Sequence, residues 1–212
     1  MLAWLEGQLE GQLLILHCCY FQHVDIYLLC RYPADIYDRI WWPENFKNVE
    51  RISTSSNVNP ATSIFQPPVT VMQSAIIPAN RGNYLWFSWP SVNTVFKYYI
   101  CMYFSEFESE QAETRSREMD IYLNGRFWSE IPPPPYLNTS THILTATNAQ
   151  QQHFISINQT ENSSLPPILN ALEIYQEKEF LQLLTNQQDG IFYMTITFFF
   201  PLSFISHNDY DF

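Results

Sequence analysis

The run at 96–107 carries an apolar side chain at every second position from 96 to 104, which is the pattern of a β-strand with one side buried. One side of that strand would hold Phe96, Tyr98, Ile100, Met102 and Phe104. Because strand side chains alternate between the two faces of a sheet, we expect these five residues to face a core. A strand with one apolar face needs a second layer of structure to cover it, so the chain must fold in at least two layers.

Shorter alternating runs follow the same pattern through residues 32–175, and Pro, Asn and Ser separate them. In one of these runs, Leu85, Phe87 and Trp89 share a face before Pro90 ends it. We expect a strand at each run, namely at 69–75, 84–89, 119–123, 142–147, 154–158 and 168–175.

Asn124 and Gly125 directly follow the run at 119–123. Both residues tolerate positive φ, so the pair predicts a two-residue hairpin with a return strand from Arg126. Short strands with frequent turns predict an all-β fold, a β-sandwich of antiparallel strands. The one helical pattern covers residues 177–184, just past the last strand.

The composition excludes several classes of function. The chain has 10 Lys and Arg against 21 Asp and Glu, a net charge of −11. We therefore expect no nucleic-acid partner, because phosphate backbones repel such a surface. Only 5 glycines are present, and no glycine-rich phosphate-binding motif occurs. We expect no nucleotide cofactor, and nothing indicates any other cofactor.

The two ends differ from the middle of the chain. Residues 1–30 contain apolar stretches that polar residues interrupt, and Glu6 and Glu10 stand where a signal peptide is basic. Residues 191–205 form an apolar run of fifteen residues that Pro201 interrupts. As a helix this run would reach about 22 Å, short of the ~30 Å hydrocarbon core of a membrane. We expect both ends to pack poorly, with a membrane anchor as the alternative for the second.

Five segments match known motifs in a fixed order: RYPADIYDRIW at 31–41, FSW at 87–89, YFSE at 103–106, MDIYLNG at 119–125 and LPPILNALEIY at 165–175. They resemble the motifs of plant malectin-like domains, which belong to the extracellular part of many leucine-rich-repeat receptor-like kinases. The resemblance covers residues 31–180 and implies a malectin-like β-sandwich there. It leaves a non-family segment at 1–30 and a short helix with a hydrophobic tail at 181–212.

The malectin-like domain of these kinases is a tandem of two sandwiches, and the segment at 31–41 lies near their junction. The resemblance implies that this chain corresponds to the second half, truncated at both ends. It also implies a place at the cell surface, on the extracellular side of the plasma membrane. The missing first sandwich or a co-receptor would be a partner. The implied function is non-catalytic recognition of a carbohydrate or peptide, or ectodomain scaffolding, and an inert gene fragment is the alternative.

Aromatic side chains supply the candidate ligand site, because their rings offer a large contact area at low entropic cost. Tyr99 and Tyr103 lie opposite the core-facing residues of the run at 96–107, and Tyr122 lies on the same side of its run as Asp120. These four residues are our ligand-binding candidates. Alternatively, the three tyrosines form a packing surface against a neighbouring sandwich.

Asn138, Asn158 and Asn162 each begin an Asn-x-Ser/Thr sequon. Each lies in a polar stretch that resembles a turn, where an acceptor asparagine has to be. We therefore expect N-linked glycan at one or more of the three if the chain enters the secretory pathway.

A glycoside-active enzyme is a further alternative, since Glu106 and Glu108 would share one face of a strand. A glycosidase places its two carboxylates on either side of the scissile bond, whereas these two would lie side by side. Cys101 as a nucleophile would need a base such as His142 or His153, and nothing in the sequence ties either to it. We expect no enzymatic activity and no catalytic residue.

His17, Cys18, Cys19 and His23 are residue types that bind zinc. They lack a Cys-x-x-Cys pair and a second ligand pair at zinc-finger spacing, so we expect no metal site. Adjacent cysteines are also poorly placed for a structural disulfide.

Overall fold

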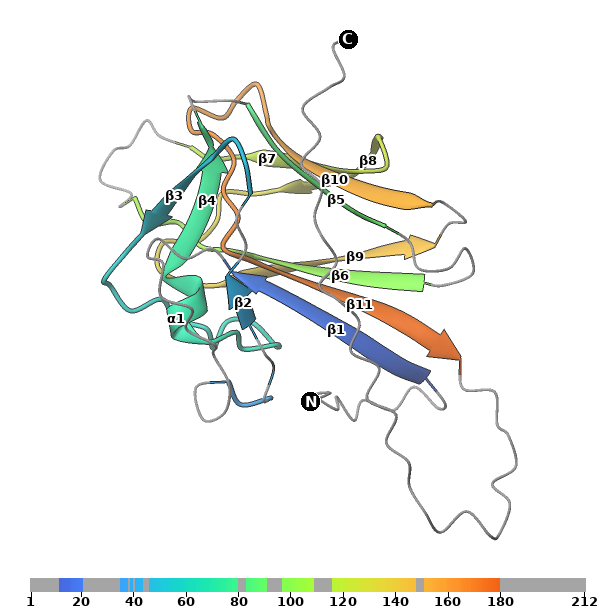
Figure 1. Ribbon diagram of the computed structural model, residues 1–212. Coiled ribbons are helices and arrows are strands. Elements are labelled where there is room, and N and C mark those ends of the chain that lie inside the picture. Colours follow the sequence, from blue (N-terminus) through green and yellow to red (C-terminus); the bar gives the residue numbers. More distant parts are fainter. Residues whose placement is uncertain are drawn as a thin grey trace, which may run out of the picture.

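The computed structural model describes residues 12–20, 35–37, 39, 41–43, 46–79, 83–90, 97–108, 116–147 and 151–179. The strands of these residues form two main sheets that lie face to face as two layers (Figure 1). This arrangement confirms the predicted all-β sandwich.

One layer is a five-stranded sheet. Its strands, in spatial order, are β2 (Trp41–Pro43), β1 (Gln12–Tyr20), β11 (Ala171–Glu179), β6 (Lys97–Phe104) and β9 (Ser140–Thr147). β1 runs parallel to β2, and the other neighbouring strands are antiparallel.

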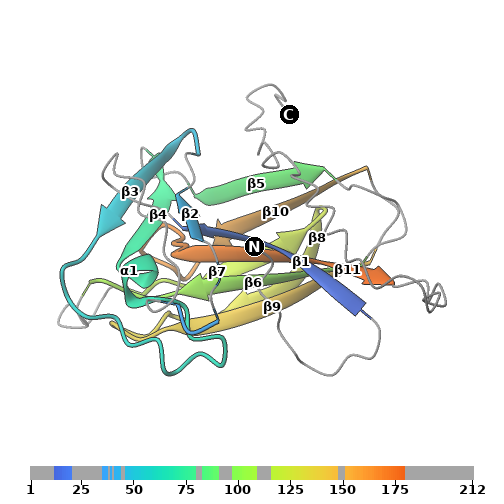
Figure 2. The ribbon, with the colours of Figure 1, turned by 60° about the horizontal axis from the view of Figure 1, so that its bottom comes forward.

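The other layer is a four-stranded antiparallel sheet. Its strands, in spatial order, are β5 (Tyr84–Pro90), β10 (Gln152–Gln159), β7 (Met119–Leu123) and β8 (Arg126–Ile131). A separate antiparallel pair, β3 (Val49–Ser53) and β4 (Ser74–Pro78), lies with the one-turn helix α1 (Val69–Met72) at one end of the two sheets (Figure 2).

The main core lies between the two layers. As predicted, β6 directs Tyr98, Ile100, Met102 and Phe104 into it, and all four are buried; Phe96 lies outside the described residues. The four-stranded sheet packs alternate side chains of its strands into the same core: Leu85, Phe87, Trp89, Ile121, Leu123, Ile155 and Ile157. The period-2 patterns therefore identified the inward residues of both layers correctly.

The opposite face of β6 is also buried. Cys101 and Tyr103 belong to a second apolar cluster with Trp41, Val71 and Met72. α1 and nearby loop residues therefore cover part of the outer side of the five-stranded sheet, which makes β6 a strand with two buried faces.

The predicted hairpin is confirmed, because Asn124 and Gly125 have φ angles of 52° and 74° and join β7 directly to β8. The predicted strand at 69–75 is wrong in its first half. The amide of Met72 donates to the carbonyl of Pro68 and that of Gln73 to the carbonyl of Val69, which are the i to i−4 hydrogen bonds of a helical turn. Pro68 is the N-cap of this turn, with φ −57° and ψ 143°, and the strand begins only at Ser74.

The prediction that residues 1–30 pack poorly is wrong for residues 12–20. β1 pairs with β11 along nine residues and with β2 along three. The backbone amide and carbonyl groups of β11 need partners on both sides, and β1 supplies one of those sides. The helix predicted at 177–184 is also wrong at its start, since residues 177–179 continue β11. The other residues of these predictions lie outside the described part.

Candidate functional site

The four-stranded sheet turns one face away from the core, and the strand register arranges its side chains in rows. Tyr84, Asn158, Asp120 and Glu130 stand opposite one another across β5, β10, β7 and β8. Their chain neighbours, such as Leu85 and Ile157, point into the core, so this row faces outward. We call these four residues the acidic row.

A second row lies two residues along β5, β10 and β7, and three residues along β8. It consists of Trp86, Ser156, Tyr122 and Phe127. The rings of Tyr122 and Phe127 meet edge to face with their centroids 5.8 Å apart. A register shift between Ile121 and Tyr122 makes Phe127 the partner of Tyr122. We call this second set the aromatic row, and the two rows together the outer face.

The outer face exposes large apolar area. The exposed fractions are 61% for Tyr84, 36% for Trp86 and 59% for Phe127. Trp128, the unpaired residue of the register shift, is 45% exposed. Tyr84 and Trp86 lie on the edge strand β5, and Phe127 and Trp128 lie on the other edge strand β8, next to Tyr122 of β7. Scattered exposed apolar residues are ordinary, but several exposed aromatic residues on one face of a sheet are characteristic of a surface that binds a partner.

The electrostatics of the acidic row are unfavourable within the chain itself. Asp120 and Glu130 are a directly opposed cross-strand pair, and like charges in that position destabilise a sheet. Within the part of the chain that the structure describes, no basic side chain forms an ion pair with either carboxylate. The row therefore presents uncompensated negative charge beside exposed rings.

The structure does not bring the four predicted ligand residues together. Tyr122 and Asp120 lie on the outer face, whereas Tyr99 and Tyr103 lie in the other sheet on β6. Tyr103 is fully buried and donates a 2.5 Å hydrogen bond to Glu173, so its prediction as a surface residue is wrong. Tyr99 is half-buried, with the Lys97 ammonium 4.8 Å from its ring centroid. The surface predicted to pack against another sandwich is likewise divided between two sheets.

Sequence reasoning missed Tyr84, Trp86 and Phe127. The alternation that placed Leu85, Phe87 and Trp89 inward also places Tyr84 and Trp86 outward, so the signal was present for β5. What the sequence lacked was the strand order, because β10 lies between β5 and β7 although it follows both in the chain.

A buried network of ion pairs and hydrogen bonds connects residues 35, 39 and 41 to the five-stranded sheet. Arg39 donates to Asp35 at 2.8 Å and to Glu173 of β11 at 2.9 Å, and all three side chains are buried. Trp41 donates its indole N–H to Asp35, and Tyr103 donates to Glu173. Burial alone would lower the pKa of Arg39, but attraction to Glu173 and Asp35 outweighs it and the pKa is raised. The guanidinium therefore stays charged, and this network is structural.

Cys101 lies beside that network. Burial raises the pKa of the Cys101 thiol far above its ordinary value, and the negative charge of Glu173 is the second cause in the same direction. The thiolate is the nucleophilic form, so this cysteine has the environment of an inert core residue.

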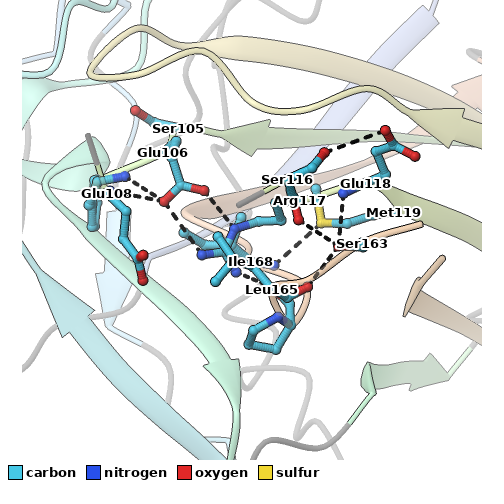
Figure 3. A network of polar contacts seen from close by, with 12 residues as sticks. Ser105, Glu106, Glu108, Ser116, Arg117, Glu118, Met119, Ser163, Leu165 and Ile168 are labelled. Atoms are coloured by element: carbon cyan, nitrogen blue, oxygen red, sulfur yellow. Dashed lines mark hydrogen bonds and ion pairs between the residues drawn. The ribbon is translucent and has the colours of Figure 1, made fainter. Parts of the chain in front are cut away.

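Glu106 and Glu108 do not form an opposed pair. Glu106 accepts hydrogen bonds from Arg117 at 2.7 Å and from the backbone amides of Phe107 and Glu108. Arg117 also bonds to the carbonyl of Pro166. Figure 3 shows the carboxylate of Glu108 directed away from that of Glu106. The buried Glu106 therefore ties loops together, and the two carboxylates do not flank a common site.

The three sequons have different settings. Asn138 lies in a loop, where its amide donates to the Tyr136 carbonyl and accepts from Asn59. Asn158 lies inside β10, between β5 and β7, so its predicted turn-like setting is wrong. Asn162 lies in an exposed turn as predicted.

No group of three metal-ligating side chains occurs among the described residues, and the side chains of His17, Cys18, Cys19 and His23 are not among them. No helix in the described ranges is long and apolar enough to cross a membrane.

A family model described as the malectin-like domain matches residues 6–177. The chain belongs to the malectin-like domain family. The match confirms the resemblance of the five motif segments, and it begins within residues 1–30, ahead of the boundary that we placed at residue 31.

Relatives of this malectin-like chain are receptor-like kinases. Probable LRR receptor-like serine/threonine-protein kinase At1g05700 of Arabidopsis thaliana is 37% identical over 161 residues, which is 76% of this chain and 19% of the kinase. The chain thus spans about a fifth of the length of the curated relatives it matches.

Solved structures share the fold at low identity. A chain in the crystal structure of the plant peptide RALF23 in complex with FER and LLG2 superposes with a TM-score of 0.58 at 16% identity, covering 77% of this chain and 49% of that one. β-Glucuronidase 2 of Bacteroides uniformis superposes with a TM-score of 0.54 at 12% identity, covering 76% of this chain and 17% of the enzyme. At these identities both likenesses concern the fold alone.

Proposed function

We propose that this malectin-like chain is a non-catalytic recognition domain of a receptor-like kinase ectodomain, held on the extracellular side of the plasma membrane, which binds its ligand through the outer face. The observation that carries the proposal is the set of exposed rings on one face of the four-stranded sheet, with Tyr84 and Trp86 on β5 and Phe127 on β8 beside Tyr122. Aromatic residues gathered in this way are enriched at protein interfaces and in ligand sites.

The comparisons support the class of function and the kind of ligand. The curated relatives are named as LRR receptor-like kinases, and a structural neighbour occurs in a complex with a peptide and LLG2. A peptide or a co-receptor is therefore a reasonable partner type for this chain, and a cell-wall carbohydrate is the other ligand class to test. The absence of catalysis rests on the arrangement of Glu106, whose carboxylate is engaged by Arg117.

Binding measurements with a defined panel test the proposal. The panel consists of immobilised plant cell-wall oligosaccharides and synthetic plant peptides, RALF23 among them. A variant carrying Trp86→Ser and Phe127→Ser should lose at least about tenfold in affinity for the panel member that binds, because central aromatic anchors contribute most of the binding energy. The matched control carries Ile64→Ser and Ile143→Ser, two exposed apolar residues outside the outer face.

The proposal fails if no panel member binds the full chain, or if the outer-face variant binds as tightly as the control. The non-catalytic part is tested with the same oligosaccharides. Release of new reducing ends by the full chain, abolished by Glu108→Gln or Glu106→Gln, would show that the chain is an enzyme.

A further inference from the structure

We propose that the outer face docks a positively charged, extended segment of a protein partner, whose Lys or Arg side chains lie over the acidic row while neighbouring apolar residues lie over the aromatic row. This inference rests on the proposed function, since it names the ligand class of the same face.

The charge of the acidic row carries the first step. Asp120 and Glu130 face each other directly across β7 and β8, and no ion pair within the described ranges neutralises either one. A cation placed between two such carboxylates replaces a repulsion by two attractions. The net charge of −11 on the whole chain adds longer-range attraction for a basic partner.

The rings beside these carboxylates carry the second step. Tyr122 follows Asp120 by two residues on β7, and Phe127 pairs with Tyr122 from β8, the strand of Glu130. Tyr84 and Trp86 lie on the same face farther away, on β5, which β10 separates from β7. Arg and Lys cations bind over the faces of Trp and Tyr rings, and a guanidinium also stacks flat on such a ring while it bonds to a carboxylate. A face with rings next to unpaired carboxylates therefore suits basic side chains better than a neutral sugar, which would leave the repulsion in place.

The spacing of the rows carries the third step. The two rows are two residues apart on β5, β10 and β7, which is about 6.8 Å along the sheet, and the register shift makes them three residues apart on β8. An extended peptide repeats its side-chain direction over nearly the same distance. A segment lying along the strands would thus place a basic residue on the acidic row and the next residue of the same side on the aromatic row. The expected ligand pattern is an alternation of basic and apolar side chains separated by one residue.

The test uses the full chain and a fluorescent synthetic peptide in which Arg and Leu alternate, separated by Gly. Matched peptides replace Arg by Gln or by Glu. We expect anisotropy to report binding of the Arg peptide, weaker binding of the Gln peptide and none of the Glu peptide, and a loss of affinity as salt is added. Equal binding of the Arg and Gln peptides would overturn the inference.

Two charge-neutralising variants complete the test. Asp120→Asn with Glu130→Gln should weaken binding of the Arg peptide about tenfold, since two surface ion pairs are lost. The same variant should melt about one degree higher, because the opposed carboxylates are gone. The control, Glu50→Gln with Glu161→Gln, removes the same charge from exposed positions elsewhere and should change neither value. Unchanged binding by the acidic-row variant would contradict the proposal.

The panel experiment separates the two proposals. One outcome is that an oligosaccharide binds the full chain, that the variant carrying Trp86→Ser and Phe127→Ser loses this binding, and that the Arg peptide does not bind. In that case this inference is wrong and the proposed function stands. If nothing in either experiment depends on the outer face, both are wrong.

Discussion

His153 is buried in the core of the sandwich, where its ring stacks on Trp89 with centroids 5.3 Å apart. Asn124 fixes its tautomer. The amide oxygen of Asn124 accepts from the backbone of Phe154, so its nitrogen donates to Nδ1 of His153, which leaves the proton on Nε2. A neutral ring is therefore built into the fold, and burial lowers the pKa of His153.

A pH dependence of stability follows for this residue. Below about pH 6.5 the unfolded chain protonates His153 while the folded chain does not, so the free energy of unfolding should fall as the pH falls from about 7 to about 5. His153→Phe keeps an aromatic ring and removes the titration, so its denaturant midpoint should change less over that range. His142, whose pKa burial also lowers, accounts for part of what remains. An identical pH slope in the variant would contradict the assignment.

The local backbone structure around each sequon asparagine determines whether that asparagine can be glycosylated. Asn162 lies in an exposed turn, whereas Asn158 is held in a strand with neighbours on both sides. An acceptor asparagine must be presented on accessible backbone, so a chain secreted from a eukaryotic host should carry glycan at Asn162 and not at Asn158. Intact-mass analysis should show one glycan lost in Asn162→Gln. Glycan at Asn158 would contradict this prediction and would also cover the outer face.

At the scale of elements, the segment at 35–41 is attached to β11 by charge. Arg39 is the one cation bonded to both Asp35 and Glu173 within the described network. Arg39→Met would leave two carboxylates buried without it, and breaking a buried pair in this way costs about 3–5 kcal/mol of stability. Lys47→Met, at an exposed position, should cost less than about 0.5 kcal/mol.

Chemical denaturation measures both free energies. A loss of less than about 1 kcal/mol in Arg39→Met would mean that the two carboxylates become neutral on folding at little cost. The variant carrying Arg39→Met and Glu173→Gln separates these cases, since it should recover part of the loss only if the unpaired charge is its cause.

Local pattern predicted the elements better than their arrangement. Alternation located the inward residues of β5, β6 and β7, and the Asn-Gly pair located the hairpin, because both signals are contained within a few residues. The helical turn at α1 was missed because Val69 and Val71 also fit the alternation of a strand, and the backbone hydrogen bonds of Met72 and Gln73 that distinguish the two are not visible in the sequence. β1 was missed because its partner β11 is the last strand of the chain, far away in sequence.

The candidate site was predictable only in part for the same reason. Tyr122 and Asp120 were found from β7 alone. Phe127 meets Tyr122 across the hairpin that the Asn-Gly pair predicts. Tyr84 and Trp86 join the same face through a strand order that no local pattern encodes. Tyr103 was misplaced because its strand alternates correctly, while the cover on its outer side comes from α1 and loop residues near it.

At the scale of the whole molecule, the five-stranded sheet depends on the start of the chain. β1 lies between β2 and β11, so without it β2 has no partner in the sheet and one edge of β11 is open. We therefore expect that residues 31–180 alone, or any variant lacking residues 1–20, will aggregate and bind a hydrophobic dye.

The loss of stability on removing β1 follows from the backbone hydrogen bonds between β1 and β11 that are lost. β1 pairs with β11 over nine residues, and each backbone hydrogen bond contributes roughly 0.5–1.5 kcal/mol, against a total stability of about 5–15 kcal/mol for a typical domain. Strand complementation provides the control. A synthetic peptide of residues 12–20, added under reducing conditions, should restore a cooperative melt, and the same peptide with Cys19→Pro should not, because Cys19 pairs with Trp42 and Leu172 at once. A soluble monomer that melts cooperatively without the peptide would show that β1 is dispensable.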